Sequence, residues 1–468
     1  MFKSNRRRSV FSNRRRSRRR FSWLGAIASV VLFLLVLELL TRIFVDLSGD
    51  RSEFAGTEAG TEIERAYRLN FVSDSSPAIA DRNSLIARSS PSVGYELVEN
   101  QESEYWQINE QGFRDTDPVP LTKPRNEVRI FLLGGSTAFG YGNSSNAATI
   151  GEQLEKRLQQ RLQQQRTSPQ LYKPDVLPFE PEKRKQELAK PSKIKPGNYR
   201  VVNAAVPGYA SGNELAQMAL QILQYKPDLI IVLDGYVDLM LPSEQKVTQA
   251  PQEYPEPQPT SFVEYLGQLI EPIENQSYLA KMAQNRWLNS PPAENKADFI
   301  FDERTDNLVQ HLPENEVELQ KRVARYIEHQ KQMLDLSAAA QVPLIVAIQP
   351  EITGRDPSQL TDEEGQITTE LGRTYISWVK NSYPTLIEPT TELAKAFPKN
   401  MKALNLYRLT DKYPSPSFVD AIHLNEGANE KVAEQLYYAI SGFSKMQLVP
   451  KQPPAPKPVA PQQQSQQQ

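Results

Sequence analysis

Short apolar runs and longer amphipathic stretches alternate along the middle of the chain. The run at 228–233 is almost wholly apolar, which is typical of a strand covered on both faces. Similar runs of strand length lie at 128–133, 199–203 and 343–348, and helical patterns lie at 149–163, 213–224, 314–340 and 425–441. This order predicts an α/β fold, a three-layer α/β/α sandwich with a mainly parallel sheet. Ligands of such folds bind at the carboxyl ends of the strands.

The N-terminal segment has a different pattern. Residues 1–20 carry ten basic side chains and no acidic one, and the next seventeen residues, Phe21 to Leu37, carry no charge. A helix over residues 21–40 would be about 30 Å long, the thickness of the hydrocarbon layer. We therefore expect one transmembrane anchor at 21–45 that is not cleaved, because the apolar run exceeds a signal-peptide core and no small-x-small site follows it. The alternatives are a removed signal peptide and a buried core helix.

The basic arm fixes the expected orientation of this anchor. Under the positive-inside rule residues 1–20 stay in the cytoplasm, and the rest of the chain lies outside it, in the periplasm. The net charge of −2 includes the ten basic residues of the arm, so residues 21–468 carry −2 − 10 = −12. The arm leads directly into the apolar run, which favours the membrane as partner and not nucleic acid.

Composition divides the remainder into a spacer, a folded domain and a tail. Residues 46–90 are polar and predict a stalk, and 91–445 predict the folded domain. Two segments rich in proline and polar residues, 164–197 and 241–313, interrupt this domain as insertions. Residues 446–468 are rich in Pro and Gln and predict a disordered tail.

The chain has no cysteine and only three histidines, His311, His329 and His423. The lack of cysteine excludes disulfides, thiolate zinc sites and iron–sulfur clusters. A metal centre with several histidines is disfavoured, and we expect neither a metal nor a cofactor. Any reaction that needs an imidazole must use one of the three histidines, of which His311 and His329 are expected to be inert.

The first apolar strand ends in a glycine-rich turn, residues 134–142. A phosphate-binding loop would need a lysine where Tyr141 stands, and a dinucleotide loop would need a third glycine where Ser145 stands. Nucleotide binding is therefore disfavoured. The glycines can instead clear space around Ser136, so that its hydroxyl faces the crevice above the sheet, although a lone serine at a strand end usually has a structural role.

Asp420 lies three residues before His423, in a segment that precedes the last predicted helix. In a turn, this spacing lets the carboxylate accept a hydrogen bond from one ring nitrogen while the other nitrogen serves as a general base. Such a pair is a weak signal alone. Its combination with a strand-end serine earlier in the chain is a stronger one.

Several segments in this order resemble the SGNH or GDSL-type hydrolases, in particular membrane-anchored bacterial members. The resemblance spans residues 90–442 and rests on 109–114, 133–137, 203–211, 234–238 and 420–423. It implies the SGNH hydrolase fold, with Ser136 as nucleophile, His423 as base and Asp420 as the group that orients His423. The backbone N–H groups of Ser136 and Gly208 would form the oxyanion hole.

The chain departs from the family pattern at two positions. Gly135 stands where many members have aspartate, and Val237 stands where the family has an asparagine that donates to the oxyanion. Val237 can offer only its backbone, and the loss of one such donor typically lowers turnover about 10²- to 10³-fold. Asn203 and Asn213 are the nearest possible substitutes, but each is also of a type common in turns and helix caps.

These observations predict a serine esterase that hydrolyses O-acyl esters, possibly O-acetyl esters, of an envelope polysaccharide or of a lipid through an acyl-enzyme. One alternative is a catalytically impaired glycan-binding or scaffold protein, and another is an O-acyltransferase.

Arg114 is expected either to neutralise an acidic substrate or to form a structural salt bridge. Asp238 is expected to support the loop below Ser136 or to cap a turn.

Overall fold

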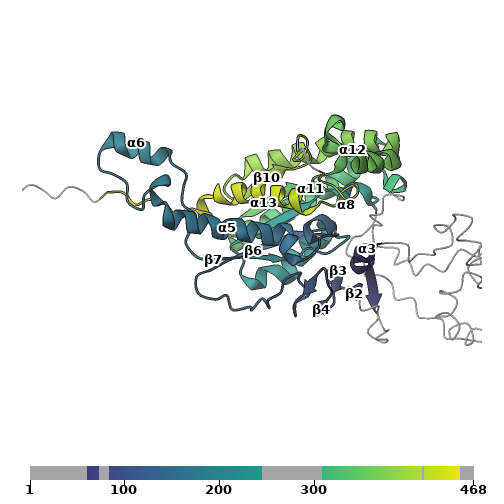
Figure 1. Cartoon of the computed structure of the whole chain (residues 1–468), viewed down its shortest axis with the longest axis horizontal. Coiled ribbons are helices and arrows are strands. Elements are labelled where there is room, and N and C mark those ends of the chain that lie inside the picture. Colours follow the sequence, from purple (N-terminus) through teal and green to yellow (C-terminus); the bar gives the residue numbers. More distant parts are fainter. Residues whose placement is uncertain (1–60, 73–83, 245–307, 414–415, 454–468) are drawn as a thin grey trace, which may run out of the picture. The chain divides into compact units, whose positions relative to one another are not determined.

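A five-stranded parallel sheet lies at the centre of the part of the chain that the computed structural model describes, residues 61–72, 84–244, 308–413 and 416–453 (Figure 1). The strand order is β10–β9–β8–β6–β7, and each neighbouring pair runs parallel. The parallel sheet predicted from the sequence is confirmed. The strands are β6 (Glu127–Gly134), β7 (Asn198–Asn203), β8 (Leu229–Asp234), β9 (Leu344–Ile348) and β10 (Met401–Asn405).

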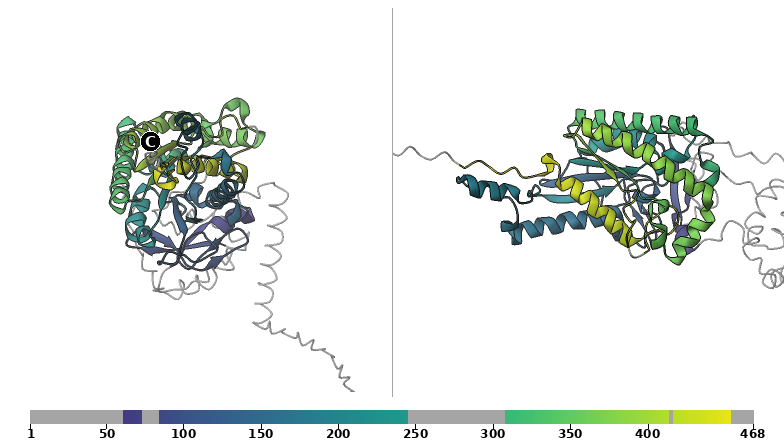
Figure 2. Two further views of the ribbon diagram at one scale, coloured as in Figure 1. Left: turned by 90° about the vertical axis from the view of Figure 1, so that its left-hand side faces the viewer. Right: turned by 90° about the horizontal axis from the view of Figure 1, so that it is seen from above.

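Helices cover both faces of this sheet and complete a three-layer α/β/α arrangement (Figure 1, Figure 2). Ile130 and Leu132 of β6 pack in the same core as α5 and α13, whereas Phe131 and Leu133 pack in a second core with residues of α11. This alternation follows from the two-residue period of a strand. The α-helices of this domain are α4 (Ser136–Phe139), α5 (Ile150–Thr167), α6 (Pro181–Ala189), α7 (Ser211–Gln217), α8 (Tyr236–Met240), α11 (Glu316–Ala340), α12 (Asp362–Ala396) and α13 (Glu426–Ser441).

Side-chain caps mark the starts of the long predicted helices. Thr149, Asn315 and Asn425 accept hydrogen bonds from backbone N–H groups in the first turns of α5, α11 and α13. The helix predicted at 213–224 is less regular. After α7 the chain continues through a π-helical turn, η3 (Met218–Ile222), and a 3₁₀ turn, η4 (Leu223–Tyr225).

The helix α12 and the edge strand β10 were not predicted from the sequence. Thr361 and Glu364 form a reciprocal capping box that begins α12. Pro384 and Pro389 lie inside the helix, and Gly372 leaves helical geometry with φ +75° and ψ +167°. These three residues obscure the helical pattern, because proline and glycine ordinarily end helices.

The segment predicted as a polar stalk, 46–90, contains folded structure at residues 61–72 and 84–90, so that boundary is corrected. Helix α3 (Glu62–Tyr67) leads into a small sheet of β1 (Leu69–Val72), β2 (Leu85–Ser90) and β3 (Gly94–Leu97), followed by the pair β4 (Gln101–Glu102) and β5 (Gln107–Ile108). Only a few side chains of this segment are buried in the core, among them Tyr67 and Leu85. A small sheet needs so few apolar residues that the segment reads as polar.

The first predicted insertion, 164–197, and the start of the predicted tail lie together. Ile194 forms a β-bridge with Gln447, and Val176 forms one with Lys451. The tail prediction is therefore corrected for residues 446–453, which pair with the insertion. The rest of the predicted tail and most of the second insertion, 241–313, lie outside the described residues, as do the basic arm and residues 46–60 of the stalk.

No helix in the described ranges is long and apolar enough to cross a membrane. The predicted anchor, 21–45, lies outside those ranges.

Candidate active site

Ser136 is the first residue of α4 and follows β6 directly. Gly134 has φ +150°, and a β-carbon there would lie 2.3 Å from the Leu233 carbonyl oxygen, so only glycine fits where β6 passes β8. Ser136 is 1% exposed, and its hydroxyl oxygen has no hydrogen-bond partner among the described residues. The turn therefore holds a buried hydroxyl that the local structure does not use.

His423 and Asp420 form the predicted pair. Nδ1 of His423 lies 2.5 Å from Oδ2 of Asp420, while Oδ1 of Asp420 accepts hydrogen bonds from the backbone N–H groups of Ile422 and His423 at 2.9 and 2.8 Å. Burial raises the pKa of Asp420, but the charge of His423 and these hydrogen bonds outweigh it and hold that pKa below its ordinary value. Nε2 is then the ring nitrogen available for proton transfer.

Two contacts from residues that follow Ser136 bring its turn against the His423 loop. Thr137 Oγ1 donates to the Ile422 carbonyl at 3.2 Å, across a sequence separation of 285 residues. The ring of Tyr141 stacks on the His423 ring with centroids 4.4 Å apart, and the Tyr141 N–H donates to the Ser136 carbonyl at 3.0 Å. The structure therefore brings the turn of Ser136 and the loop of Asp420 and His423 together.

Gly208 lies in the loop after β7, with φ +80°. The Tyr95 hydroxyl donates to the carbonyl oxygen of Pro207, the residue before Gly208, at 2.7 Å. No peptide bond in the described segments is cis, so the N–H of Gly208 points away from that carbonyl and from Tyr95. Tyr95 of β3 thus sets the direction of the N–H group assigned to the oxyanion hole.

Val237 lies beside the nucleophile turn. Its Cγ2 atom is 3.8 Å from the position that a β-carbon on Gly135 would occupy. The structure therefore places a methyl group of Val237 next to the turn that carries Ser136.

The two asparagines considered as substitutes are engaged elsewhere. The Asn203 amide donates to the carbonyls of Ala138 and Phe139 at 3.1 and 3.2 Å, which fixes the end of α4. The Asn213 amide donates to the Val93 carbonyl at 2.9 Å. Both amide groups therefore have structural hydrogen bonds, and the structure gives neither a contact with Ser136.

Asp238 supports the loop that carries Gly208. Its carboxylate accepts hydrogen bonds from the N–H and the hydroxyl of Ser211 at 2.9 and 2.5 Å. The Ser211 hydroxyl is also 2.8 Å from Nδ1 of His329, so this histidine is a structural part of the support. Burial lowers the pKa of His329.

Arg114 is buried, and the partners that the described residues give it are neutral oxygens, not the carboxylate of a salt bridge. Its guanidinium donates to the carbonyls of Phe139, Gly140 and Tyr105 and to the Tyr67 hydroxyl, over distances of 2.8 to 3.1 Å. Burial lowers its pKa. Arg114 thus holds the carbonyl groups at the end of α4 in place.

Sequence reasoning missed Tyr67, Tyr95 and Gln349 as supports of the site. The amide of Gln349 donates to Thr137 Oγ1 at 3.0 Å, next to Ser136. The only signal for the tyrosines was the presence of aromatic residues in a polar stretch. Within the described ranges, no cluster of three or more His, Cys, Asp or Glu side chains is arranged to hold a metal ion.

The family of the chain follows from its match to a family model. Residues 130–436, more than half of the chain, match the model of the GDSL-like Lipase/Acylhydrolase family. The chain belongs to this family. The matched range contains Ser136, Gly208, Val237, Asp420 and His423. Membership of the GDSL family suggests ester hydrolysis.

Solved structures of low sequence identity also match. They include a lipase/acylhydrolase from Enterococcus faecalis, with 13% identity over 67% of this chain and 95% of the other and a TM-score of 0.33. The psychrotrophic esterase EstA from Pseudoalteromonas sp. has 10% identity, coverages of 67% and 96% and a TM-score of 0.31. A GDSL-like lipase from Bacteroides thetaiotaomicron has 12% identity, coverages of 67% and 88% and a TM-score of 0.28. A comparison with curated proteins gives no significant match.

Proposed function

We propose that this GDSL-family protein is a serine esterase in which Ser136, His423 and Asp420 act together. The observation that carries the proposal is the Thr137–Ile422 hydrogen bond, reinforced by the stacking of Tyr141 on His423. These contacts bring the turn of Ser136 against the loop of His423, whose ring is oriented by the Asp420 carboxylate. The proposal is that the Ser136 hydroxyl and Nε2 of His423 act together across this contact.

The reaction proceeds in two halves. Nε2 of His423 takes the Ser136 proton as Oγ attacks the ester carbonyl, and the tetrahedral oxyanion accepts hydrogen bonds from the N–H groups of Ser136 and Gly208. The intermediate collapses, the alcohol leaves with the proton from His423, and an acyl-Ser136 ester remains. Water then attacks the carbonyl of acyl-Ser136 while His423 takes one of its protons. The second tetrahedral intermediate collapses, Ser136 Oγ leaves with the proton from His423, and the carboxylic acid is released.

Asp420 keeps His423 in the productive state. Its lowered pKa keeps the carboxylate ionised at neutral pH, so Nδ1–H of His423 has a charged acceptor. The imidazolium that forms during the reaction is stabilised by the same carboxylate.

The proposed substrates are O-acyl esters, including O-acetyl esters, on an envelope polysaccharide, with lipid esters second. This choice rests on the proposed anchor at 21–45, with residues 1–20 in the cytoplasm and the domain in the periplasm. A reporter fused after residue 60 should be active only outside the cytoplasm, and activity inside it would overturn this orientation.

Val237 supports the alternative function, a catalytically impaired protein that binds envelope glycans on the same fold, because its side chain cannot donate a hydrogen bond to an oxyanion.

A second alternative is an O-acyltransferase. Transfer of the acyl group to a sugar hydroxyl, in place of transfer to water, would use the same residues. Product analysis with an added sugar acceptor separates transfer from hydrolysis.

Hydrolysis of p-nitrophenyl acetate by the full-length protein tests the proposed chemistry. Wild-type protein should release p-nitrophenol, and Ser136→Ala and His423→Ala should each reduce kcat by at least about 10³-fold. Ser168→Ala is the matched control, because the Ser168 side chain forms no helix-capping hydrogen bond. A folded wild-type protein without turnover would favour the impaired alternative.

A further inference from the structure

A cavity of about 210 Å³ lies between the small N-terminal sheet, the chain around Gln111 and the helical segment from α7 to η4. Val206 and Tyr209, on either side of Gly208, form part of its wall. We propose that this cavity binds one neutral sugar residue of an ester-bearing glycan while a neighbouring residue of the same glycan reaches Ser136. Only the claim that a neighbouring residue reaches Ser136 rests on the proposed esterase function; the claim that the cavity binds a sugar residue does not.

Gln217 places a buried acceptor, without a partner in the described part of the chain, in the wall of the cavity. It lines the cavity and is 2% exposed. Its Nε2 atom donates to the Ala204 carbonyl at 2.8 Å, which fixes the orientation of the amide. Its Oε1 atom has no hydrogen-bond partner among the described residues. A buried acceptor left without a donor costs about 1–3 kcal/mol, so a ligand hydroxyl at this point would be stabilising.

The other polar groups of the lining suit hydroxyl groups better than charges. Gln111, Gln221 and Gln224 also line the cavity. An amide side chain carries both donor and acceptor atoms, as recognition of a sugar hydroxyl requires, although the Gln111 amide already bonds Val119 and Glu110. None of the lining residues is Lys or Arg. The carboxylate of Glu96 already accepts from Arg88 and from Gln221, both at 3.0 Å. The lining therefore favours a neutral ligand over an anionic one.

Two aromatic rings give the cavity an apolar surface. Phe113 and Tyr225 both line it and pack edge to face, with ring centroids 5.8 Å apart. Such a surface can cover the C–H face of a sugar ring while the amides bond its hydroxyls. The volume is below the roughly 300–1,000 Å³ of pockets for drug-sized ligands, which matches one ring and not a chain.

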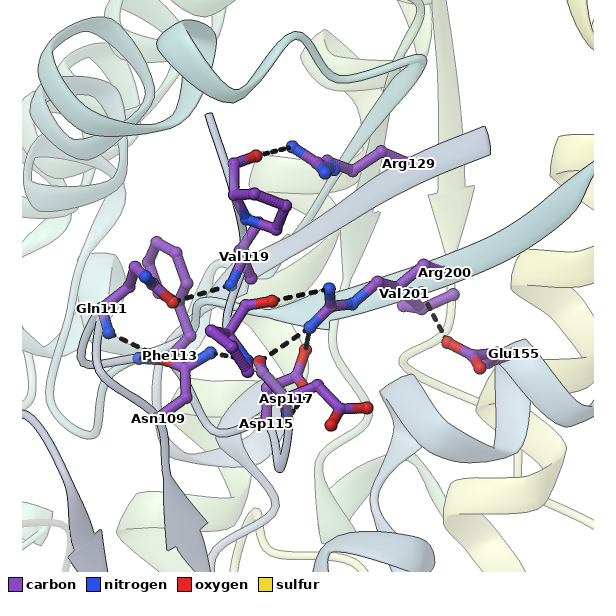
Figure 3. Close-up of polar contacts among 12 residues, drawn as sticks. Asn109, Gln111, Phe113, Asp115, Asp117, Val119, Arg129, Glu155, Arg200 and Val201 are labelled. Atoms are coloured by element: carbon purple, nitrogen blue, oxygen red, sulfur yellow. Dashed lines mark hydrogen bonds and ion pairs between the residues drawn. The ribbon is translucent and has the colours of Figure 1, made fainter. Parts of the chain in front are cut away.

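The wall that carries Gln111 and Phe113 is held in place before any ligand arrives. Gln111 Oε1 accepts from the Val119 N–H at 2.8 Å, and Arg200 of β7 donates to the carbonyls of Pro118 and Asp117 at 2.9 and 2.7 Å (Figure 3). A site that is already ordered loses less conformational entropy when a ligand binds.

The cavity and the nucleophile lie on opposite sides of one loop. A β-carbon on Gly135 would be 3.1 Å from the carbonyl oxygen of Tyr209, so the backbone of Tyr209 adjoins the turn of Ser136. Tyr209 also lines the cavity, together with Val206. A glycan bound in the cavity would thus contact the loop that presents the Gly208 N–H.

Binding to full-length Ser136→Ala protein, measured by isothermal titration calorimetry, tests the proposal without turnover. The probes are cellotetraose, xylotetraose and chitotetraose, with their methyl monosaccharides to distinguish a glycan chain from a free sugar. At least one neutral tetrasaccharide should bind, and Gln217→Leu and Gln221→Ala should each weaken binding by about tenfold. Gln320→Leu, on the exposed face of α11, is the matched control and should bind as the parent does.

Gln221→Ala keeps the test decisive if Gln217→Leu fails to fold, because Gln221 is only half-buried. The proposal would be overturned if none of the three tetrasaccharides bound, which would indicate that only water fills the cavity. It would also be overturned if the folded Gln217→Leu and Gln221→Ala variants bound the tetrasaccharide with unchanged affinity. Turnover of p-nitrophenyl acetate, which contains no sugar, reports on the esterase separately, so failure of either proposal can be recognised.

Discussion

The Val237 side chain presents methyl groups beside Gly135, close to the backbone of Ser136. The Asn203 and Asn213 amides, which could have compensated, donate instead to the backbone carbonyls of Ala138, Phe139 and Val93. In the proposed mechanism the oxyanion therefore depends on backbone N–H groups. An amide at position 237 would act mainly in the transition state, where the negative charge develops.

Val237→Asn should raise kcat for p-nitrophenyl acetate by about 10- to 100-fold with little change in KM, because the added donor favours the oxyanion over the ester. Val237→Ala, which removes methyl groups without adding a donor, is the control. Steady-state kinetics of the two variants would contradict this account if Val237→Asn were no faster than Val237→Ala.

Among individual residues, the sequence pointed to the proposed reacting residues more clearly than to their supports. Ser136, Asp420 and His423 stand in short local patterns, and the structure brings their two segments together. Tyr95 and Arg114 act through backbone carbonyls distant in sequence, and no local pattern encodes such partners.

The start of α12 holds the chain that leads to Asp420. Oε2 of Glu364 closes the capping box on the Thr361 N–H at 3.1 Å, and its Oε1 accepts from the N–H groups of Ser417 and Phe418 at 2.9 and 3.2 Å. Arg355 lies 3.5 Å from the same carboxylate, and both side chains of this ion pair are fully buried. The capping residue Glu364 thus also positions the loop that leads to Asp420 and His423.

Glu364→Ala should lower the free energy of unfolding by about 3–5 kcal/mol, because it removes one member of a fully buried ion pair and the acceptor of two backbone N–H groups. It should also lower kcat, since the loop before Asp420 loses its anchor. Urea unfolding and kinetics check both effects. Glu363→Ala, one residue earlier on the exposed side of the same helical turn, is the control, and equal stability of the two variants would contradict the assigned role.

Most elements with a regular apolar pattern were predicted, and elements whose pattern is weak or interrupted were missed. The strands of the sheet stood out except for β10, an edge strand with only one buried position. Helix α12 was missed because Pro384, Pro389 and Gly372 interrupt its pattern. Helix α3 and β2 were assigned to a stalk because few of their side chains are buried.

For the molecule as a whole, buried carboxyl groups make stability depend on pH. Burial raises the pKa of Glu351 to about 7, although hydrogen bonds from Thr353 and Tyr375 favour its ionised form. Because this pKa is higher in the folded than in the unfolded state, the stability it contributes is full below about pH 4.5 and is lost as the pH rises through about 7. Asp234 and Glu152 are shifted in the same direction, also mainly by burial.

The free energy of unfolding should therefore be larger at pH 5 than at pH 8. Glu351→Gln should reduce this difference by about 3 kcal/mol, the linkage expected for a shift from 4.5 to about 7. Urea unfolding at the two pH values provides the measurement, with the exposed Glu328→Gln as control. A pH difference as large in Glu351→Gln as in wild type would be inconsistent with a buried, neutral Glu351.

The most direct test of the central claim is to map where a fluorophosphonate probe attaches to the folded full-length protein, by intact mass and peptide mass spectrometry. We predict one adduct per chain, on Ser136, formed much more slowly in His423→Ala and absent in Ser136→Ala. An adduct on another residue, or labelling at an unchanged rate in His423→Ala, would contradict the claim that His423 activates Ser136.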